Sequence, residues 1–277
     1  MRQGLIIAAL LTLLAGCSVI EQPRIQVTPL APTPAADPGG SPAAEPDPAA
    51  SPPGDGEWRE LEPGLEWREL RAGLSNAQAL RIDPAQMNIR VAYDAASPGR
   101  VSEWMEALGP LAVVNGGYFD EQGRATALTV YDGVAEGSSY DGFGGMLAVD
   151  AAGALSIRSL RDQPYDPAEN LAQALQSTPM LVQQGAAVPL PSDNGERSRR
   201  TVAALDGDGR LLLIAIGWPS FSLSELGQWL ADGDLGVVTA LNLDGGSSTG
   251  MQMQNEVKTV NVDSLVRVPQ VVLVERR

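Results

Sequence analysis

A segment rich in proline, alanine and glycine, from about Ser18 to Gly56, limits where this chain can fold. Its many prolines lack a backbone N–H, and no periodic apolar face runs through it, so it cannot form a packed core. We therefore expect residues 17–56 to be an extended or disordered tether and residues 57–277 to hold the folded part. That length suits one sizeable domain and is short for two.

The residues before the tether have the form of a bacterial export signal. Arg2 is followed by an apolar run from Leu5 to Leu14, which is too short to span a bilayer as a stable helix. The run leads into Leu-Ala-Gly-Cys17, which resembles the lipobox of bacterial lipoproteins, where the cysteine is lipidated and becomes the mature N-terminus. The sequence thus predicts a signal peptide over residues 1–16 and an exported protein that is anchored to the cell envelope by lipid on Cys17. In a Gram-negative cell the outer membrane is the expected place. An ordinary cleaved signal with a chance cysteine is the alternative.

Missing residue types narrow the chemistry. The chain has no histidine, and Cys17 is its one cysteine. This excludes a histidine-based triad, a thiolate metal site and an intrachain disulfide. Any acid–base catalysis must therefore use Asp, Glu, Tyr or Lys. The net charge of −15, without a Lys/Arg cluster of the needed kind, argues against nucleic acid as a partner. No cofactor is expected.

Apolar patterns predict more strands than helices. Strands are expected at "AQALRIDP", "MNIRVAY", "LAVVN" (111–115), residues 236–241 and "PQVVLVE", and the turn Asp206–Gly209 joins two apolar runs as a hairpin. Helices are expected from Ser102, as N-cap, to Leu108, within 167–175, and after the capping box Ser222-x-x-Glu225. Because no regular βα alternation appears, we predict a single α+β domain with a mixed, mostly antiparallel twisted sheet and a few packed helices.

Two of the expected strands end in polar, glycine-rich stretches. They are "LAVVNGGYFD" (111–120) and "TALNLDGGSST" (239–249). Glycine pairs permit positive φ and let the backbone come close to a ligand. Two such ends in one domain suggest a shared pocket, lined with Asn115, Asp120, Asp244, Ser247 and Ser248. For either stretch alone, a turn with capping side chains is the favoured explanation, because glycine pairs are common in turns.

A local positive charge lies in "GERSRRTVAALD", which contains Arg197, Arg199, Arg200 and Thr201. Arginine binds phosphate or carboxylate oxygens through two parallel hydrogen bonds. A solvated loop is the alternative, and Arg200 fits it least because an apolar strand starts there.

These motifs occur in the order seen in the phosphodiester glycosidase family. The matching stretches are Asn-Gly-Gly-Tyr-Phe-Asp (115–120), Pro179-Met-Leu-Val182 with Gly185, Arg200-Thr201 before a strand, and Leu241-Asn-Leu-Asp-Gly-Gly-Ser-Ser-Thr249. The chain resembles this family from about Ile82 to Val274. It departs from the family pattern in having two glycines rather than three after the aspartate, and Arg-Thr-Val-Ala-Ala in place of Arg-Thr-Ala-Ile-Gly.

The resemblance implies a hydrolase that cleaves a sugar joined through its anomeric carbon to a phosphodiester, here in phosphorylated cell-envelope or exopolysaccharide glycans. A carboxylate can stabilise or attack the oxocarbenium-like state, and arginine can neutralise the leaving phosphate without proton transfer. Whether the carboxylate is nucleophile, base or electrostatic stabiliser stays open. The expected catalytic residues are Asp244, Asp120, Arg200 and Asn115, and the expected substrate-binding residues are Gly116, Gly117, Thr201, Gly245, Gly246, Ser247 and Ser248.

Two other functions fit the same residues. One is a cell-envelope lipoprotein that binds polysaccharide without cleaving it. The other is a metal-dependent hydrolase in which Asp244, Asp120 and Asn115 are oxygen ligands for Ca²⁺ or Mg²⁺, although no dense run of ligands such as an EF-hand loop appears. In each case the expected contact with the membrane is through the lipid anchor alone.

Overall fold

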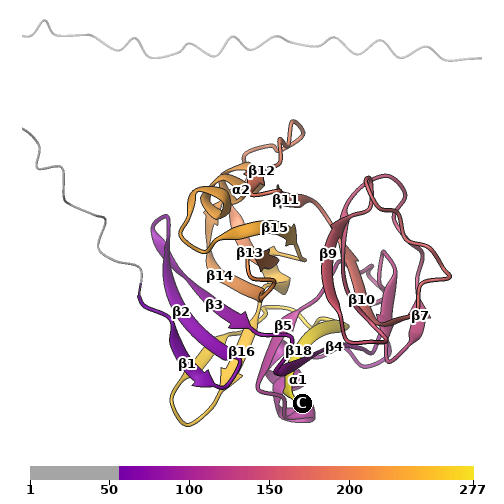
Figure 1. Cartoon of the computed structure of the whole chain (residues 1–277), viewed down its shortest axis with the longest axis horizontal. Coiled ribbons are helices and arrows are strands. Elements are labelled where there is room, and N and C mark those ends of the chain that lie inside the picture. Colours follow the sequence, from indigo (N-terminus) through magenta and orange to yellow (C-terminus); the bar gives the residue numbers. More distant parts are fainter. Residues whose placement is uncertain (1–55) are drawn as a thin grey trace, which may run out of the picture. The chain divides into compact units, whose positions relative to one another are not determined.

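Residues 56–277 form three antiparallel sheets and two α-helices in the computed structural model, which describes this part of the chain (Figure 1). The predicted signal peptide, the lipidation site Cys17 and the tether up to residue 55 lie outside the described residues. Neither helix, nor any other in residues 56–277, combines the length and apolar character needed to cross a membrane.

The predicted fold class was wrong. The described residues contain eighteen strands, and every pair of neighbouring strands is antiparallel. The strands build three sheets rather than one mixed sheet with packed helices. The molecule is therefore mostly β. The strand patterns indicate burial, but they do not say which strands pair, so they cannot show the division into three sheets.

The first sheet has eight strands and the other two have five each. The first sheet runs in the order β1 (Arg59–Glu62), β2 (Leu65–Ala72), β3 (Ser75–Ile82), β14 (Leu211–Phe221), β13 (Ser198–Asp206), β15 (Val237–Asn242), β11 (Met180–Gln183), β12 (Ala186–Ala187). The second runs β17 (Thr259–Val262), β16 (Met251–Gln254), β5 (Ala112–Asn115), β18 (Gln270–Arg276), β4 (Met87–Tyr93). The third runs β7 (Val134–Glu136), β6 (Thr129–Tyr131), β10 (Leu171–Ser177), β8 (Gly145–Asp150), β9 (Leu155–Ser159).

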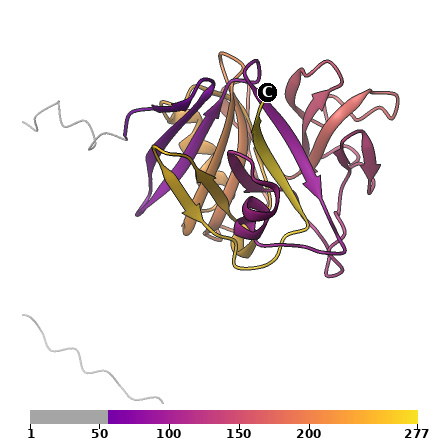
Figure 2. The same ribbon diagram turned by 90° about the horizontal axis from the view of Figure 1, so that it is seen from below.

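Alternating side chains on the strands build the core. On β13, Ala203 belongs to the cluster between the sheets, whereas Val202 and Ala204 belong to the cluster beneath helix α2 (Leu223–Asp232). In the second sheet, inner side chains such as Val114 meet the first sheet, and outer ones such as Val113 pack under helix α1 (Val101–Leu108). Figure 2 shows α1 on the outer face of this sheet. The first two sheets thus pack face to face, with one helix on each outer side.

The two helices match the sequence in part. The capping box before α2 is confirmed: Ser222 N donates to Glu225 Oε2 at 2.9 Å, and Glu225 N donates to Ser222 Oγ at 3.3 Å. The N-cap of helix α1 is Arg100, two residues before the predicted N-cap Ser102. Ser102 is already inside the helix, where its hydroxyl donates to Asp263 Oδ2 at 2.8 Å.

The predicted helix within 167–175 was wrong, because this segment enters β10 at Leu171. β10 is the middle strand of the third sheet and pairs with both β6 and β8. Hydrogen bonding to a strand on each side outweighs the helical pattern of the local sequence. The hairpin at Asp206–Gly209 is confirmed by the pairing of β13 with β14.

Candidate active site

Three strands of the first two sheets bring the predicted motifs together where their ends meet. Asn115 ends β5, Thr201 lies near the start of β13, and Asp244 follows the end of β15. β13 and β15 are antiparallel neighbours, with Val202 opposite Asn242. The start of β13 and the end of β15 therefore lie together, which brings Thr201 and Asp244 to the same end of the first sheet. Asn115 comes from the second sheet and meets them there.

The side chain of Asn115 joins these segments and is fully buried. Its Nδ2 donates to the backbone oxygens of Asp244, at 2.7 Å, and Gly116, at 3.3 Å. Its Oδ1 accepts from Thr201 Oγ1 at 2.7 Å and from Gly250 N at 3.0 Å. Two donors and two acceptor positions are the full capacity of an asparagine amide. Asn115 therefore holds the site together and has no polar group left for a ligand.

Asp244 is a partly buried carboxyl group in a fixed position. Its backbone N donates to Gly116 O at 3.1 Å, and its Oδ1 accepts from Gly245 N at 2.9 Å. Burial raises the pKa of Asp244 to about 6, although hydrogen bonds from Ser248 and Gly245 oppose the shift. A carboxyl group that titrates near neutral pH at the end of a buried strand is a candidate for acid–base or nucleophilic chemistry.

Arg200 places a positive charge beside this turn. Its Nε donates to Phe221 O at 3.2 Å and its Nη2 donates to Glu196 O at 2.8 Å, both backbone carbonyls. Nη1 lies 3.9 Å from the position that a Cβ on Gly245 would occupy. No ion pair of Arg200 occurs within residues 56–277. Burial lowers the pKa of this guanidinium, which nonetheless stays charged at neutral pH.

Sequence reasoning missed Tyr118, whose hydroxyl is close enough to Asp244 and Arg200 to feel both charges. Its hydroxyl donates to Thr178 O at 3.1 Å and accepts from Asn242 Nδ2 at 2.9 Å. Burial, followed by the charge of Asp244, raises the pKa of Tyr118 to about 12, so the phenol is neutral in the physiological range. Its place directly after Gly116-Gly117 in the matching motif was the signal that could have identified it.

The glycines of both motifs allow backbone segments to pack closely. A Cβ on Gly116 would lie 2.8 Å from Gln270 Cγ, and one on Gly117 would lie 2.7 Å from Gln176 O. A Cβ on Gly245 would lie 2.9 Å from Arg199 O, and Gly246 has a φ of +59°, which favours glycine. Their neighbours in the structure are thus protein atoms of adjoining strands and loops.

Asp120 lies apart from the hydrogen-bonded group around Asn115. Its carboxylate accepts from Gln122 N, Arg124 N and Arg124 Nε, each at 2.9 Å. The bond from the Arg124 backbone, ahead of the other contacts, holds the pKa of Asp120 below its usual value. No hydrogen bond in the described part of the chain joins it to Asn115 or Asp244. Of the two serines, Ser248 is buried against Asp244, while Ser247 is exposed.

The predicted oxygen ligands for a metal do not gather into one group. In residues 56–277 no three Asp, Glu, His or Cys side chains are arranged to hold an ion. The amide of Asn115 is fully used, and Asp120 is held in its own loop.

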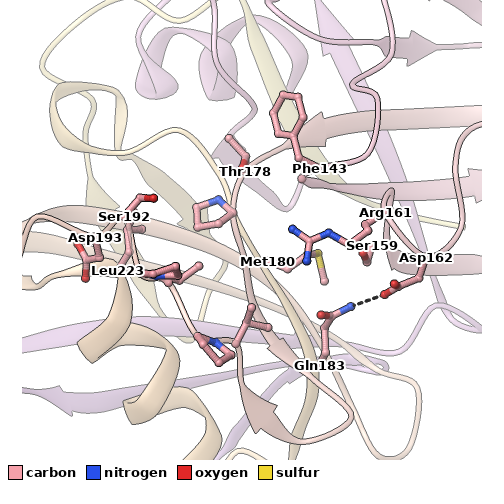
Figure 3. A pocket seen from close by; sticks show the side chains of 16 residues that line it. Phe143, Ser159, Arg161, Asp162, Thr178, Met180, Gln183, Ser192, Asp193 and Leu223 are labelled. Atoms are coloured by element: carbon pink, nitrogen blue, oxygen red, sulfur yellow. Dashed lines mark hydrogen bonds between the residues drawn. The ribbon is translucent and has the colours of Figure 1, made fainter.

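A cavity of about 410 Å³ adjoins the site and is shown in Figure 3. Asp244 is not among its lining residues, but Thr178 is, and the carbonyl oxygen of Thr178 accepts from Tyr118 Oη and from Asn242 Nδ2. Thr178 therefore belongs both to the cavity wall and to the hydrogen-bonded group of Tyr118 and Asn242.

Comparison with known proteins supports one family. The family model for phosphodiester glycosidases matches residues 109–275. No curated protein matches the chain. The fold is similar to the catalytic domain of zebrafish N-acetylglucosamine-1-phosphodiester alpha-N-acetylglucosaminidase, auto-inhibited by its pro-peptide, with a TM-score of 0.63 and 17% identity over 81% of this chain and 87% of that one. A hypothetical protein from Synechocystis has a TM-score of 0.58 and 15% identity, over 83% of this chain and 65% of its own. At such identities the likeness shows a shared fold.

Proposed function

The chain belongs to the phosphodiester glycosidase family, and on that premise we propose that it hydrolyses a sugar joined through its anomeric carbon to a phosphodiester. The observation that carries the proposal is that a fixed carboxyl group, Asp244, lies in a turn next to the guanidinium of Arg200, which has no carboxylate partner among residues 56–277.

Asp244 supplies the group that acts on the anomeric carbon. Cleavage there passes through an oxocarbenium-like state, which an ionised carboxylate can attack or stabilise, or for which it can activate water as a base. The backbone N of Gly245 and the hydroxyl of Ser248 hold this carboxylate in place. With a pKa of about 6, it is mostly ionised at pH 7 and above.

Arg200 supplies charge for the leaving group. A departing phosphate monoester is a weak base, so neutralising its charge matters more than protonating it. Two backbone carbonyls already orient this guanidinium, leaving Nη1 available toward the Asp244 turn. The net charge of −15 disfavours long-range steering of an anionic substrate, so a local cation has to offset it.

The other predicted residues take supporting roles in this proposal. Asn115 and Thr201 are positioning residues, because their side chains are hydrogen-bonded to each other and are buried. The hydrogen bonds of Asp120 favour an ordering role in the 120–124 loop over that of a second reacting carboxylate. We further propose, from residues 1–17 of the sequence, that the enzyme acts on cell-envelope glycans as an exported, lipid-anchored protein.

Asp244→Asn tests the reaction. Hydrolysis of a sugar-1-phosphodiester should fall by roughly a thousandfold or more, because the amide can neither attack nor accept a proton. For the wild type, kcat/KM should rise with pH through about 6 and level off above it, since the ionised carboxylate is the working form.

The matched control is Asp208→Asn. Asp208 is also followed by a glycine in a turn, but it lies in the exposed β13–β14 hairpin. This control should keep wild-type activity. Normal hydrolysis by Asp244→Asn would overturn the role of Asp244, and glycan binding by the wild type without any product would favour a non-catalytic binding protein.

A further inference from the structure

The cavity beside the active site lies where the third sheet meets the first. Phe143, Ser159 and Arg161 line it from the side of β8 and β9, and Met180 and Gln183 line it from β11. The loop over residues 188–193 and the first turn of α2 close the remaining side. Figure 3 shows the side chains around this space. Its volume and its mixture of apolar walls with a few polar groups are typical of a small-molecule or sugar-binding site.

Arg161 is the available charge in this cavity. Figure 3 shows its guanidinium directed into the space between Met180 and Phe143. Arg161 makes no hydrogen bond or ion pair within residues 56–277, a contrast with the arginines that pair with carboxylates elsewhere in the fold. An arginine of this kind binds a phosphate or carboxylate through two parallel hydrogen bonds.

The two carboxylates that line the cavity accept hydrogen bonds from groups other than Arg161. Asp162 Oδ2 accepts from Gln183 Nε2 at 3.0 Å, as the dashed line in Figure 3 marks. Asp193 accepts from Gly195 N at 3.2 Å and from Ser224 N at 2.8 Å. The bond from Ser224, ahead of the others, lowers the pKa of Asp193 to about 2. The guanidinium of Arg161 is therefore available to bind an anionic group of a ligand.

Phe143 provides an aromatic surface at the same cavity. Its ring is stacked on Tyr140, with centroids 4.5 Å apart, and the residue is still 47% exposed. The C–H face of a pyranose ring packs well on the negative face of an aromatic ring, and the stack on Tyr140 limits the motion of this surface.

Thr178 connects the cavity to the reacting groups. It lines the cavity, while its carbonyl oxygen accepts from Tyr118 Oη at 3.1 Å and from Asn242 Nδ2 at 2.9 Å. On the opposite wall, the negative charge of Asp193 is close enough to raise the pKa of Arg200, in opposition to burial. Because the charge of Asp244 also acts on Tyr118, the hydrogen-bond partner of Thr178, the cavity adjoins the reacting groups.

We propose that this cavity is a second subsite of the active site, and that it binds a further sugar unit that carries an oxyanion. The proposal rests on the proposed function. Arg161 binds the oxyanion, a phosphate or a carboxylate, and Phe143 packs against the sugar ring. The substrate class is then an anionic glycan chain rather than a single sugar phosphodiester.

Binding to the full chain carrying Asp244→Asn tests the subsite independently of hydrolysis. Three glycosyl phosphodiesters of equal length serve as probes and differ only at the second sugar. One carries a phosphate there, one carries a carboxylate, and the third, called the neutral probe, has no charge on that sugar. Calorimetry should show the better of the two anionic probes binding about tenfold more tightly than the neutral one, as expected for one charge-assisted pair. Which anion binds better identifies the natural group.

Adding Arg161→Ala to the Asp244→Asn chain should abolish the preference for the anionic probes, and Arg161→Lys in its place should keep part of that preference. The control Arg59→Ala removes the same charge from β1, at the opposite end of the first sheet from β11, and should leave the preference unchanged. Phe143→Ala should weaken all three probes by a similar factor, and Phe143→Tyr should restore them.

Equal binding of anionic and neutral probes to the Asp244→Asn chain, or an unchanged preference in the Arg161→Ala variant, would overturn the subsite. A wild-type protein that hydrolyses none of the probes while the preference persists would overturn the proposed function and leave the subsite standing.

Discussion

Asp244 carries a carboxyl group whose ionisation opposes folding. Its pKa is about 6 in the folded state and 3.8 as an ordinary aspartate. A group with a raised folded-state pKa contributes stability that is fully present below about pH 3.8 and is lost as the pH rises through about 6. Keeping an ionised carboxylate partly buried lowers the stability of the folded state, and such a cost is common for residues that take part in catalysis.

This shift predicts how Asp244→Asn affects stability. Because the asparagine does not titrate, the Tm of the variant relative to wild type should be higher at pH 8 than at pH 4. Calorimetry at the two pH values measures the difference. Asp193, whose pKa is lowered to about 2, is the opposite control: Asp193→Asn should be destabilising above pH 4 and approach wild type only below it. A pH-independent difference for Asp244→Asn would contradict the raised pKa.

Arg200 is expected to matter through its charge. Arg200→Ala should lower kcat/KM for a sugar-1-phosphodiester by roughly a hundredfold, and that for a neutral aryl glycoside far less, because only the first leaving group carries a phosphate. Steady-state kinetics on both substrates checks this, with Arg200→Lys expected to be intermediate because it lacks the planar fork. Equal losses on the two substrates would show that Arg200 only supports the fold.

At the residue scale, the sequence could predict that Asn115 and Asp244 end buried strands, but not the hydrogen bonds they make. The glycine pairs and polar residues after each strand were visible locally. That the amide of Asn115 is fully used by Asp244, Gly116, Thr201 and Gly250 depends on contacts between two sheets. Tyr118 was overlooked for the same reason, since its partner Thr178 lies between β10 and β11 and its partner Asn242 ends β15.

At the scale of single elements, the glycines after β5 decide how closely strands approach. Gly117→Ala would place a Cβ 2.7 Å from the backbone oxygen of Gln176, so one strand has to move. We expect a loss of about 1–3 kcal/mol in the free energy of unfolding. Because Tyr118 follows directly, we also expect lower hydrolytic activity. Urea denaturation and steady-state kinetics measure the two effects.

Gly207→Ala is the matched control for that substitution. Gly207 has no neighbouring atom within 4 Å of an added Cβ and no positive φ. Its replacement should change the free energy of unfolding by less than about 0.5 kcal/mol. A Gly117→Ala variant as stable and active as this control would show that the β5 loop tolerates displacement.

Elements with strong local signals were predicted correctly, including the strands seen as β4, β5, β15 and β18, but the partners of the strands were not, nor was the conformation of β10. The capping box at Ser222 and the turn at Asp206 carry their own hydrogen bonds, so their sequences suffice. β10 is different, because β6 and β8 on either side decide its conformation. The fold class failed in the same way: antiparallel pairing of segments far apart in the chain separates the strands into three sheets.

At the scale of the whole molecule, the predicted lipid anchor can be tested directly. Radiolabelled palmitate should enter the wild-type protein, and Cys17→Ala should release the protein from membranes in soluble or unprocessed form, because it removes the one thiol in the chain. Membrane fractionation and the label measure these outcomes. A wild type that takes up no label would contradict lipidation.

The position of β18 has a consequence for when the enzyme can become active. β18 is the last strand described, yet it lies between β5 and β4, which come early in the chain. The ribosome therefore makes β4 and β5 long before the strand that joins them, and closing such distant pairs is slow. Until β18 arrives, Asn115 at the end of β5 lacks the neighbouring strand that holds it opposite Asp244. A nascent chain is thus without a working site, which suits a protein that we propose is exported.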